Sequence, residues 1–232
     1  EIKAQLARLR SVALPKVSVY KGTLPLNQEQ AQAVEMAAQS SLFVLCGGPG
    51  SGKTHTAAVI AQVLITQFSD SCQLALTAPT GKAALRLGES LSRNSFLIPY
   101  LEKFPPVTLH ALIKKAEGDT LAADVILIDE SSMIDCRILA ELLKRIKTGA
   151  RVVFLGDPHQ LGPVEHGVAF SPLIRSMKKG KEIAYLKECV RIETPSLLRL
   201  ANGVRDGDVY CVENELKSSQ SIYCKDLEGC EY

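Results

Sequence analysis

Length, composition and charge limit what this chain can be. Its 232 residues are 46% hydrophobic, which suffices for one large domain, or for one domain and part of another. The net charge of +2 is too small to indicate a nucleic-acid-binding protein from composition alone, and no apolar run approaches the roughly eighteen residues of a membrane span. We therefore expect a globular, cytoplasmic protein with no membrane partner.

The cysteines and the first residue give two further expectations. The seven cysteines are an odd number without a C-x-x-C pair, which indicates neither a disulfide framework nor a zinc site. Cys46 and Cys72 lie in or beside apolar runs, where a thiol behaves as a small hydrophobic side chain. Because the chain begins at Glu1 without a methionine, we expect it to be part of a longer polypeptide.

Three segments differ in character along the chain. Residues 1–23 include "LPKVSVYKGTLP", whose prolines and glycine indicate a linker or the end of a missing upstream domain. Residues 24–180 alternate short apolar runs with longer segments of helical spacing. Residues 181–232 contain the apolar run "EIAYLKECV", a predicted helix and a polar stretch, which we interpret as the incomplete start of a second domain.

The central segment is predicted to be a doubly wound α/β domain. Apolar runs at 41–46, 73–78, 124–129 and 151–156 are typical of buried parallel strands. The segments between them have the length and spacing of crossover helices. We expect a mostly parallel sheet flanked by helices, with the ligand site at the carboxyl ends of the strands.

The segment "GGPGSGKT" matches the P-loop pattern G-x-x-x-x-G-K-[ST] and lies between a predicted strand and a predicted helix. Its glycines let backbone N–H groups point at a triphosphate, and the helix N-terminus adds partial positive charge. We expect Lys53 to reach the β and γ phosphates and the Thr54 hydroxyl to bind Mg²⁺. The predicted nucleotide-binding residues of this loop are Gly47, Gly48, Pro49, Gly50, Ser51, Gly52, Lys53, Thr54 and His55.

A second strand, "VILIDES", ends on two acids. Asp129 is placed to hold Mg²⁺, directly or through water, and Glu130 to take a proton from the attacking water. The alternative for Glu130 is that it caps the following turn. Together with the P-loop, the acid pair predicts a hydrolase that acts on ATP or GTP.

Basic residues are concentrated in one part of the chain. Residues 79–115 contain six basic and two acidic side chains, so this segment has a net charge of +4. Because the whole chain has a net charge of +2, the rest of the chain has a net charge of −2. Such asymmetry permits a phosphate-binding face, although a solvated helix face is equally compatible with it.

Six motifs occur in the order typical of superfamily 1 helicases: "LNQEQAQAV", "CGGPGSGKT", "TAPTGKAA", "TLH", "LIDESSMID" and "FLGDPHQLGPV". They cover residues 26–164 almost without a gap. The details "APTGKAA", "DESSMID" and "GDPHQLGPVE" most resemble the RecD branch, to which the alpha subunit of bacterial exodeoxyribonuclease V belongs. The resemblance implies a RecA-like P-loop domain that uses ATP and Mg²⁺.

The resemblance also implies roles for residues at matching positions. Gln30 corresponds to a glutamine that recognises adenine, because a side-chain amide can hydrogen-bond with both the donor and the acceptor on the edge of that base. The alternative is that Gln30 is a solvated residue at the start of a helix. A histidine in an apolar stretch more commonly packs against neighbouring side chains, but the "TLH" context favours a contact between His110 and a nucleic-acid strand. The implied DNA-binding residues are Pro79, Thr80, Lys82, Thr108 and His110.

Two further catalytic residues are assigned beyond Lys53 and the acid pair. We expect strand 151–156 beside the Asp129 strand, so that Gln160 contacts the γ phosphate while Asp157 fixes its loop. Arg191, in "LKECVRIE", corresponds in position to the arginine of the family's fourth motif. That segment lacks the glutamines and the aromatic residue that usually accompany the arginine.

The implied function is ATP-driven translocation along single-stranded DNA, 5′ to 3′ by resemblance, in DNA end processing and recombinational repair. RecB- and RecC-like subunits are the implied partners. Because no later arginine motif follows residue 193, we expect this piece to bind nucleotide but to be weak or inactive as a motor. An RNA helicase of the same superfamily and a nucleotide-switch module are the alternatives. Nuclease activity is not expected, because no second cluster of carboxylates is present.

Overall fold

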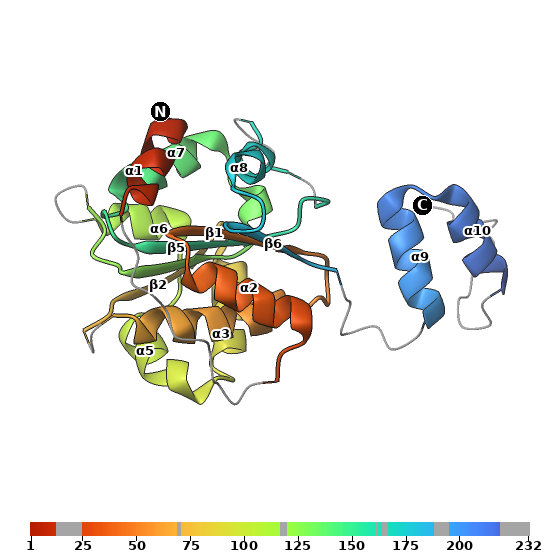
Figure 1. Ribbon diagram of the computed structural model, residues 1–232, viewed down its shortest axis with the longest axis horizontal. Coiled ribbons are helices and arrows are strands. Elements are labelled where there is room, and N and C mark those ends of the chain that lie inside the picture. The colour runs from red at the N-terminus through yellow and green to blue at the C-terminus, as the bar shows by residue number, and fades with distance from the viewer. Residues whose placement is uncertain are drawn as a thin grey trace, which may run out of the picture. The chain divides into compact units, whose positions relative to one another are not determined.

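The chain forms two compact units, Glu1–Lys187 and Glu188–Tyr232. The computed structural model describes residues 1–12, 25–68, 71–116, 120–160, 162–163, 167–187 and 195–218. In the first unit, a sheet lies between two layers of helices (Figure 1). Its elements are α1 (Ile2–Arg10), α2 (Gln28–Ala38), β1 (Leu42–Gly47), α3 (Lys53–Thr66), β2 (Leu74–Ala78), α4 (Gly81–Leu91), the 3₁₀ turn η1 (Ser95–Leu97), α5 (Ile98–Lys103), β3 (Val107–Thr108), α6 (Leu109–Lys114), β4 (Val125–Ile128), the 3₁₀ turn η2 (Ser131–Met133), α7 (Cys136–Arg145), β5 (Arg151–Gly156), α8 (Phe170–Ser176) and β6 (Ile183–Leu186).

The sheet has the parallel topology that the sequence predicts. The strand order is β3-β2-β4-β5-β1-β6, and each neighbouring pair is parallel. Strand β5 lies between β4 and β1, as expected for a strand whose tip approaches both Asp129 and the P-loop. Because all strands run the same way, the loops after β1, β2, β3, β4 and β5 leave the sheet at one edge.

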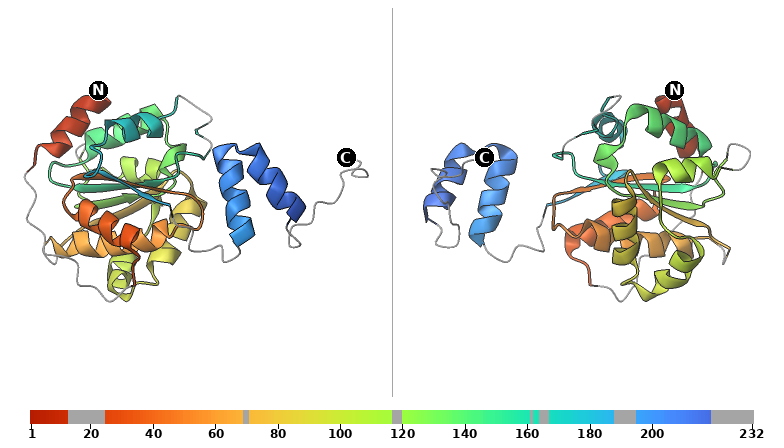
Figure 2. Two further views of the ribbon diagram at one scale, coloured as in Figure 1. Left: turned by 45° about the vertical axis from the view of Figure 1, so that its right-hand side comes forward. Right: turned by 180° about the vertical axis from the view of Figure 1, so that it is seen from behind.

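The two faces of the sheet are covered by different helices. Along β1, Leu42 and Val44 pack with α1, α6, α7 and α8, whereas Phe43 and Leu45 pack with α2, α3 and α4. Every residue of β1, β2, β4 and β5 is buried. Alternate side chains therefore enter two separate cores, which explains why these strands are continuous apolar runs. Figure 2 shows the two layers from further directions.

Helix α1 belongs to the first unit, which differs from the expectation that residues 1–23 are a linker or the end of an upstream domain. Its Leu6 and Leu9 are buried in the core beneath α7. The Arg8 guanidinium donates to the carbonyls of Leu143 and Ile146 at 2.8 Å each, and so caps the last turn of α7. Residues 13–24 lie outside the described ranges.

Strand β6 also belongs to the first unit, so this unit extends past the expected boundary at residue 180. It pairs with β1 from Val44↔Ile183 to Gly47↔Leu186. The first part of the apolar run that we assigned to a second domain, Ile183–Leu186, therefore extends the sheet beside the P-loop strand. This correction matters for the site, because β6 flanks the start of the phosphate loop.

The second unit has two described helices, α9 (Pro195–Asp206) and α10 (Val209–Ser218), which contact each other. An ion pair joins Arg199 to Glu215, and the Asp208 carboxylate accepts the Cys211 N–H at 3.0 Å at the start of α10. Arg191 lies outside the described residues. Within the described part of the chain, no helix combines the length and apolar character that a bilayer crossing needs.

Replacing Gly156 with alanine is expected to destabilise the first unit by about 1–3 kcal/mol, because the added Cβ overpacks the core. That Cβ would lie 2.5 Å and 2.8 Å from two ring carbons of the buried Phe170. Urea denaturation measures the free energy of unfolding. Gly81→Ala is the matched control, since the nearest atom to its Cβ is 4.0 Å away. Equal stability of the two variants would contradict the tight packing at the β5 tip.

Candidate nucleotide site and nucleic-acid face

The P-loop joins the end of β1 to the first turn of α3. Gly50 and Gly52 have φ angles of 78° and 79°, a left-handed conformation that L side chains rarely adopt. Ser51 is buried, and its hydroxyl donates to the Gly48 carbonyl at 2.8 Å. The Lys53 ammonium donates to the carbonyls of Gly47 and Gly48, the latter at 2.9 Å. The turn therefore keeps the lysine folded over the loop at the N-terminus of a 14-residue helix.

Two glycines of this loop have different surroundings. A Cβ at Gly47 would lie 2.5 Å from Ser51 Oγ and 3.1 Å from the Leu186 carbonyl of β6, so a larger residue would displace the Ser51 side chain from its place in the loop. A Cβ at Gly48 would meet nothing closer than Asp157 Oδ2 at 3.9 Å, so this side of the backbone is open. An open glycine backbone beside a lysine and a helix N-terminus is suited to an anionic group.

Asp129 follows β4 and is held by backbone contacts on both sides. Its N–H donates to the Thr77 carbonyl of β2 at 2.9 Å, and its Oδ1 accepts the Glu130 N–H at 2.8 Å. Burial raises the pKa of the Asp129 carboxyl, although the Glu130 hydrogen bond and the charge of Lys53 act in the opposite direction. A desolvated carboxylate near the P-loop lysine is suited to a cation that restores its lost hydration.

Glu130 has a strained backbone. Its φ of 49° and ψ of 39° are left-handed, and within the described ranges it is the one residue other than glycine with a positive φ. Such a conformation costs about 1–3 kcal/mol. It places the residue at the start of the η2 turn, where no side-chain cap hydrogen bond from Glu130 occurs. The alternative that Glu130 serves as a side-chain cap is therefore not what the geometry shows.

The loop after β5 is fixed by Asp157 and contacts the segment after β4. Asp157 is 5% exposed, its Oδ1 accepts the His159 N–H at 2.9 Å, and its carbonyl accepts the Gln160 N–H at 3.2 Å. The Oε1 of Gln160 in turn accepts the Ser132 hydroxyl at 3.2 Å. Ser132 is buried in η2, two residues after Glu130. Gln160 is thus joined to the acid segment by a side-chain hydrogen bond.

Ser132 was not among the predicted site residues. The sequence does contain an indication of its role, because Ser132 lies in "DESSM", shortly after the two acids. A small hydroxyl side chain at that position can reach the end of a neighbouring strand. Its partner could not be known without the fold, since Gln160 is 28 residues away in sequence.

Gln30 is buried at the start of α2 and takes part in a reciprocal cap. Its Oε1 accepts the Asn27 N–H at 3.1 Å, and its own N–H donates to Asn27 Oδ1 at 2.8 Å. The side chain is therefore ordered, unlike the solvated residue that was the alternative. His55 lies on α3 with its Nε2 3.1 Å from the Pro25 carbonyl oxygen, so α3 contacts the approach to α2.

The predicted nucleic-acid contacts lie on two neighbouring strand ends. β2 pairs with β3 through Ala78↔Thr108, which brings the loop of Thr80 beside that of Thr108. Thr80 caps α4 by accepting the Ala83 N–H at 3.2 Å, and Thr108 caps α6 by accepting the Ala111 N–H at 3.2 Å. Each hydroxyl keeps its proton for another acceptor. The exposed members of the predicted set are Thr80, Lys82 and His110.

Cys46 lies close to the site but is not a reactive group. Burial raises the pKa of the Cys46 thiol to about 12, with Asp157 adding to the effect, so this thiol is inert. Within the described ranges, no group of three or more His, Cys, Asp or Glu side chains could hold a metal ion.

The comparisons with known proteins agree with the motifs. The AAA domain family model matches residues 25–226. RecBCD enzyme subunit RecD of Mycolicibacterium smegmatis is 34% identical over 200 residues, which are 78% of this chain and 36% of that protein. The ATP-dependent RecD2 DNA helicase of Deinococcus radiodurans is 32% identical over 197 residues, which are 84% of this chain and 26% of that protein. The chain thus spans about a quarter to a third of the length of these relatives.

A solved structure supports the fold. The Pif1 helicase from Bacteroides, solved in complex with ADP-AlF3 and ssDNA, matches with a TM-score of 0.52 at 19% identity. The match covers 88% of this chain and 52% of that one. At this identity the likeness shows the architecture, a parallel sheet flanked by helices as in RecA-like P-loop helicase domains. The chain belongs to the AAA domain family, and over most of its length it is similar in sequence to the RecD proteins.

Proposed function

We propose that this chain is the first motor domain of an ATP-dependent DNA helicase of the RecD type. One observation carries the proposal: the predicted nucleotide residues and the predicted strand-contact residues follow adjacent parallel strands at one edge of the sheet. β4 stands between β2, which leads to Thr80, and β5, which leads to Gln160. A domain that only stores nucleotide has no use for the second group of residues. The likeness to RecD proteins supports the same conclusion.

Each residue of the proposed ATP site has a distinct task. Lys53 offsets the charge of the β and γ phosphates. Thr54 and Asp129 would hold Mg²⁺ through their side-chain oxygens, and the bound ion would neutralise charge that develops on the phosphate oxygens. Glu130 accepts a proton from the attacking water. Gln30 positions the adenine edge from its buried site on α2.

Gln160 is proposed to couple hydrolysis to movement. Its side chain is tied to Ser132, close to Glu130, and its loop is held by Asp157 at the β5 tip. A change in the position of the segment that carries Asp129 and Glu130 is therefore transmitted to the Gln160 loop through one hydrogen bond, which can break and re-form. Pro79, Thr80, Lys82, Thr108 and His110 grip the strand by backbone contacts, so little sequence preference is expected.

The remaining parts of the motor lie outside the described geometry. We propose that residues beyond Lys187 begin a second RecA-like domain, with Arg191 as a γ-phosphate contact, and that the whole protein acts in the cytoplasm with RecB- and RecC-like subunits in DNA end processing. This chain alone binds nucleotide but hydrolyses it weakly, because the cleft needs both domains. Strong DNA-stimulated turnover by this chain alone would overturn that proposal.

The decisive experiment compares ATPase stimulation by single-stranded DNA and by RNA in the polypeptide that carries both motor domains. Stimulation by DNA well above that by RNA supports the DNA motor. Equal stimulation favours an RNA helicase of the same superfamily, and absent stimulation favours a nucleotide switch. Either of these results would overturn the proposed function.

Replacing Gln160 with alanine is expected to spare ATP affinity and to uncouple hydrolysis from translocation. The amide contacts the Ser132 hydroxyl but lies outside the P-loop, so removing it leaves the phosphate cradle intact. Translocation rate divided by ATPase rate measures the coupling. Ser132→Ala, which removes the other half of the hydrogen bond, is expected to act in the same direction. Unchanged turnover and unchanged translocation in Gln160→Ala would show that this residue is not the sensor.

A further inference from the structure

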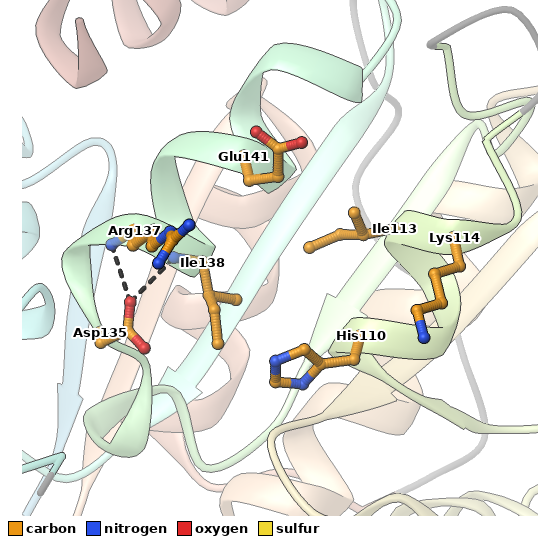
Figure 3. A pocket seen from close by; sticks show the side chains of 7 residues that line it. All are labelled: His110, Ile113, Lys114, Asp135, Arg137, Ile138 and Glu141. Carbon is orange, nitrogen blue, oxygen red and sulfur yellow. Dashed lines mark hydrogen bonds between the residues drawn. The ribbon is translucent and has the colours of Figure 1, made fainter. Parts of the chain in front are cut away.

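A groove of about 470 Å³ lies between α6 and α7, outside the P-loop and the acid pair. Figure 3 shows side chains of α6 on one wall and those of α7 and its cap on the other. The lining residues are His110, Ile113, Lys114, Asp135, Arg137, Ile138 and Glu141. His110 is the only one of them with a role proposed above, so the groove extends past the predicted nucleic-acid face.

The two carboxylates of the groove are committed to its own structure. Asp135 is 7% exposed, and its Oδ1 accepts the N–H groups of Arg137 and Ile138 at 2.7 Å and 2.8 Å, which caps α7. Glu141 forms an ion pair one turn later with Arg145. Their negative charges are therefore balanced, by a helix N-terminus in one case and by a guanidinium in the other.

The two strong cations are available for a ligand. Lys114 and Arg137 are exposed, and the part of the chain that the structure describes gives neither side chain a hydrogen-bonded or ion-paired partner. Both line the groove, Lys114 from α6 and Arg137 from α7, and Ile113 and Ile138 lie between these two residues (Figure 3). The groove thus combines two unpaired positive charges with an apolar floor.

The groove continues from a strand end that already belongs to the proposed DNA face. Thr108 ends β3 and caps α6, His110 follows in the first turn, and Lys114 is four residues further on the same helix. Residues four apart lie on one face of a helix. A strand that contacts Thr108 and His110 therefore meets Lys114 next, and Arg137 across the groove.

We propose that this groove holds the backbone of the single-stranded nucleic acid beyond His110, with Lys114 and Arg137 each binding one phosphate. The sugar or base between the two phosphates packs on Ile113 and Ile138. This inference rests on the proposed function, because the strand is the one that the motor is proposed to move. An acidic peptide is the other class of ligand that two cations attract, but the shared His110 places the groove on the path of the nucleic acid.

Salt dependence is the property that tests this proposal. Each phosphate neutralised on a single strand contributes about 0.7 to the slope of log affinity against log salt concentration. Binding of a fluorescent thymidine oligonucleotide of about 12 nucleotides is measured by anisotropy over a series of salt concentrations, in the polypeptide that carries both motor domains. The variant Lys114→Ala/Arg137→Ala is expected to bind more weakly at low salt, with the slope reduced by about 1.4.

A matched control removes the same charges elsewhere in the same helix layer. Arg175→Ala/Lys178→Ala deletes one arginine on α8 and one lysine just after it, both exposed and outside the groove. Its salt slope is expected to equal that of the unmodified protein. The charge-retaining variant Lys114→Arg/Arg137→Lys is expected to restore the slope, which shows that the effect is one of charge and not of folding.

Two outcomes overturn the groove assignment. One is an unchanged slope in the alanine variant, and the other is an equal reduction in the control. If the slope is unchanged and the alanine variant also loses binding of a fluorescent polyglutamate peptide, the groove belongs to an acidic protein. Failure of the proposed function looks different, because single-stranded DNA would then stimulate the ATPase activity of the unmodified protein no more than RNA does, or not at all.

Discussion

Lys53→Ala is expected to weaken ATP binding and to lower turnover by about 10²- to 10³-fold, the loss of rate typical of removing one preorganised electrostatic contact from a developing negative charge. Lys53 is the charged group of the P-loop, and its ammonium lies against the carbonyls of Gly47 and Gly48. No neighbouring cation of the loop can replace it, since "GGPGSGKT" contains no other basic residue. Affinity is measured with a fluorescent ATP analogue on this chain, and turnover on the polypeptide with both domains.

Two companion variants separate charge from geometry. Lys53→Arg keeps the charge but carries a larger planar group, and it is expected to recover little, because a guanidinium cannot take the compact position of the ammonium against the Gly47 and Gly48 carbonyls. Lys178→Ala, an exposed lysine after α8, is expected to leave affinity unchanged. If Lys53→Ala bound ATP as the unmodified chain does, the phosphates would have to lie elsewhere and the site would be misassigned.

The central strands could be predicted because a strand that is buried on both faces of the sheet is a continuous run of apolar residues. The segments between these runs have the length and spacing of helices. The four predicted strands correspond to β1, β2, β4 and β5, each shifted by at most a residue or so. Two strands escaped recognition for physical reasons. β3 has only two residues, and β6 is an edge strand whose burial is interrupted, with Tyr185 47% exposed. An edge strand has one neighbour, so its apolar pattern is weaker.

Contacts between distant segments could not be predicted from one sequence. Arg8 caps α7 across 135 residues, so the N-terminal helix joined the first unit without any local signal. The motifs placed Lys53, Asp129 and Gln160 on strand ends that meet, but not the left-handed backbone of Glu130 or the Ser132–Gln160 hydrogen bond. The groove between α6 and α7 is likewise a product of helix packing, because Lys114 and Arg137 lie on different helices and outside the quoted motifs.

Glu130→Gln is expected to reduce ATP turnover by about 10²- to 10⁴-fold while leaving ATP affinity nearly unchanged. The substitution keeps the size of the side chain and removes its ability to accept a proton. Asp129, whose pKa is raised by burial and which is proposed to bind the metal, is untouched. Single-turnover hydrolysis, measured with the same polypeptide as for Lys53, distinguishes slow chemistry from slow product release.

Glu130→Gly separates the catalytic role of this residue from its backbone strain. Glycine adopts a φ of 49° without steric cost, so this variant is expected to be more stable than the unmodified chain by about 1 kcal/mol in urea denaturation, although it hydrolyses ATP no faster than Glu130→Gln. Higher stability with lost turnover means that the strained conformation is retained for the sake of the carboxylate. A Glu130→Gln protein with undiminished single-turnover hydrolysis would instead show that another group accepts the proton, and the strain at this position would then have no catalytic explanation.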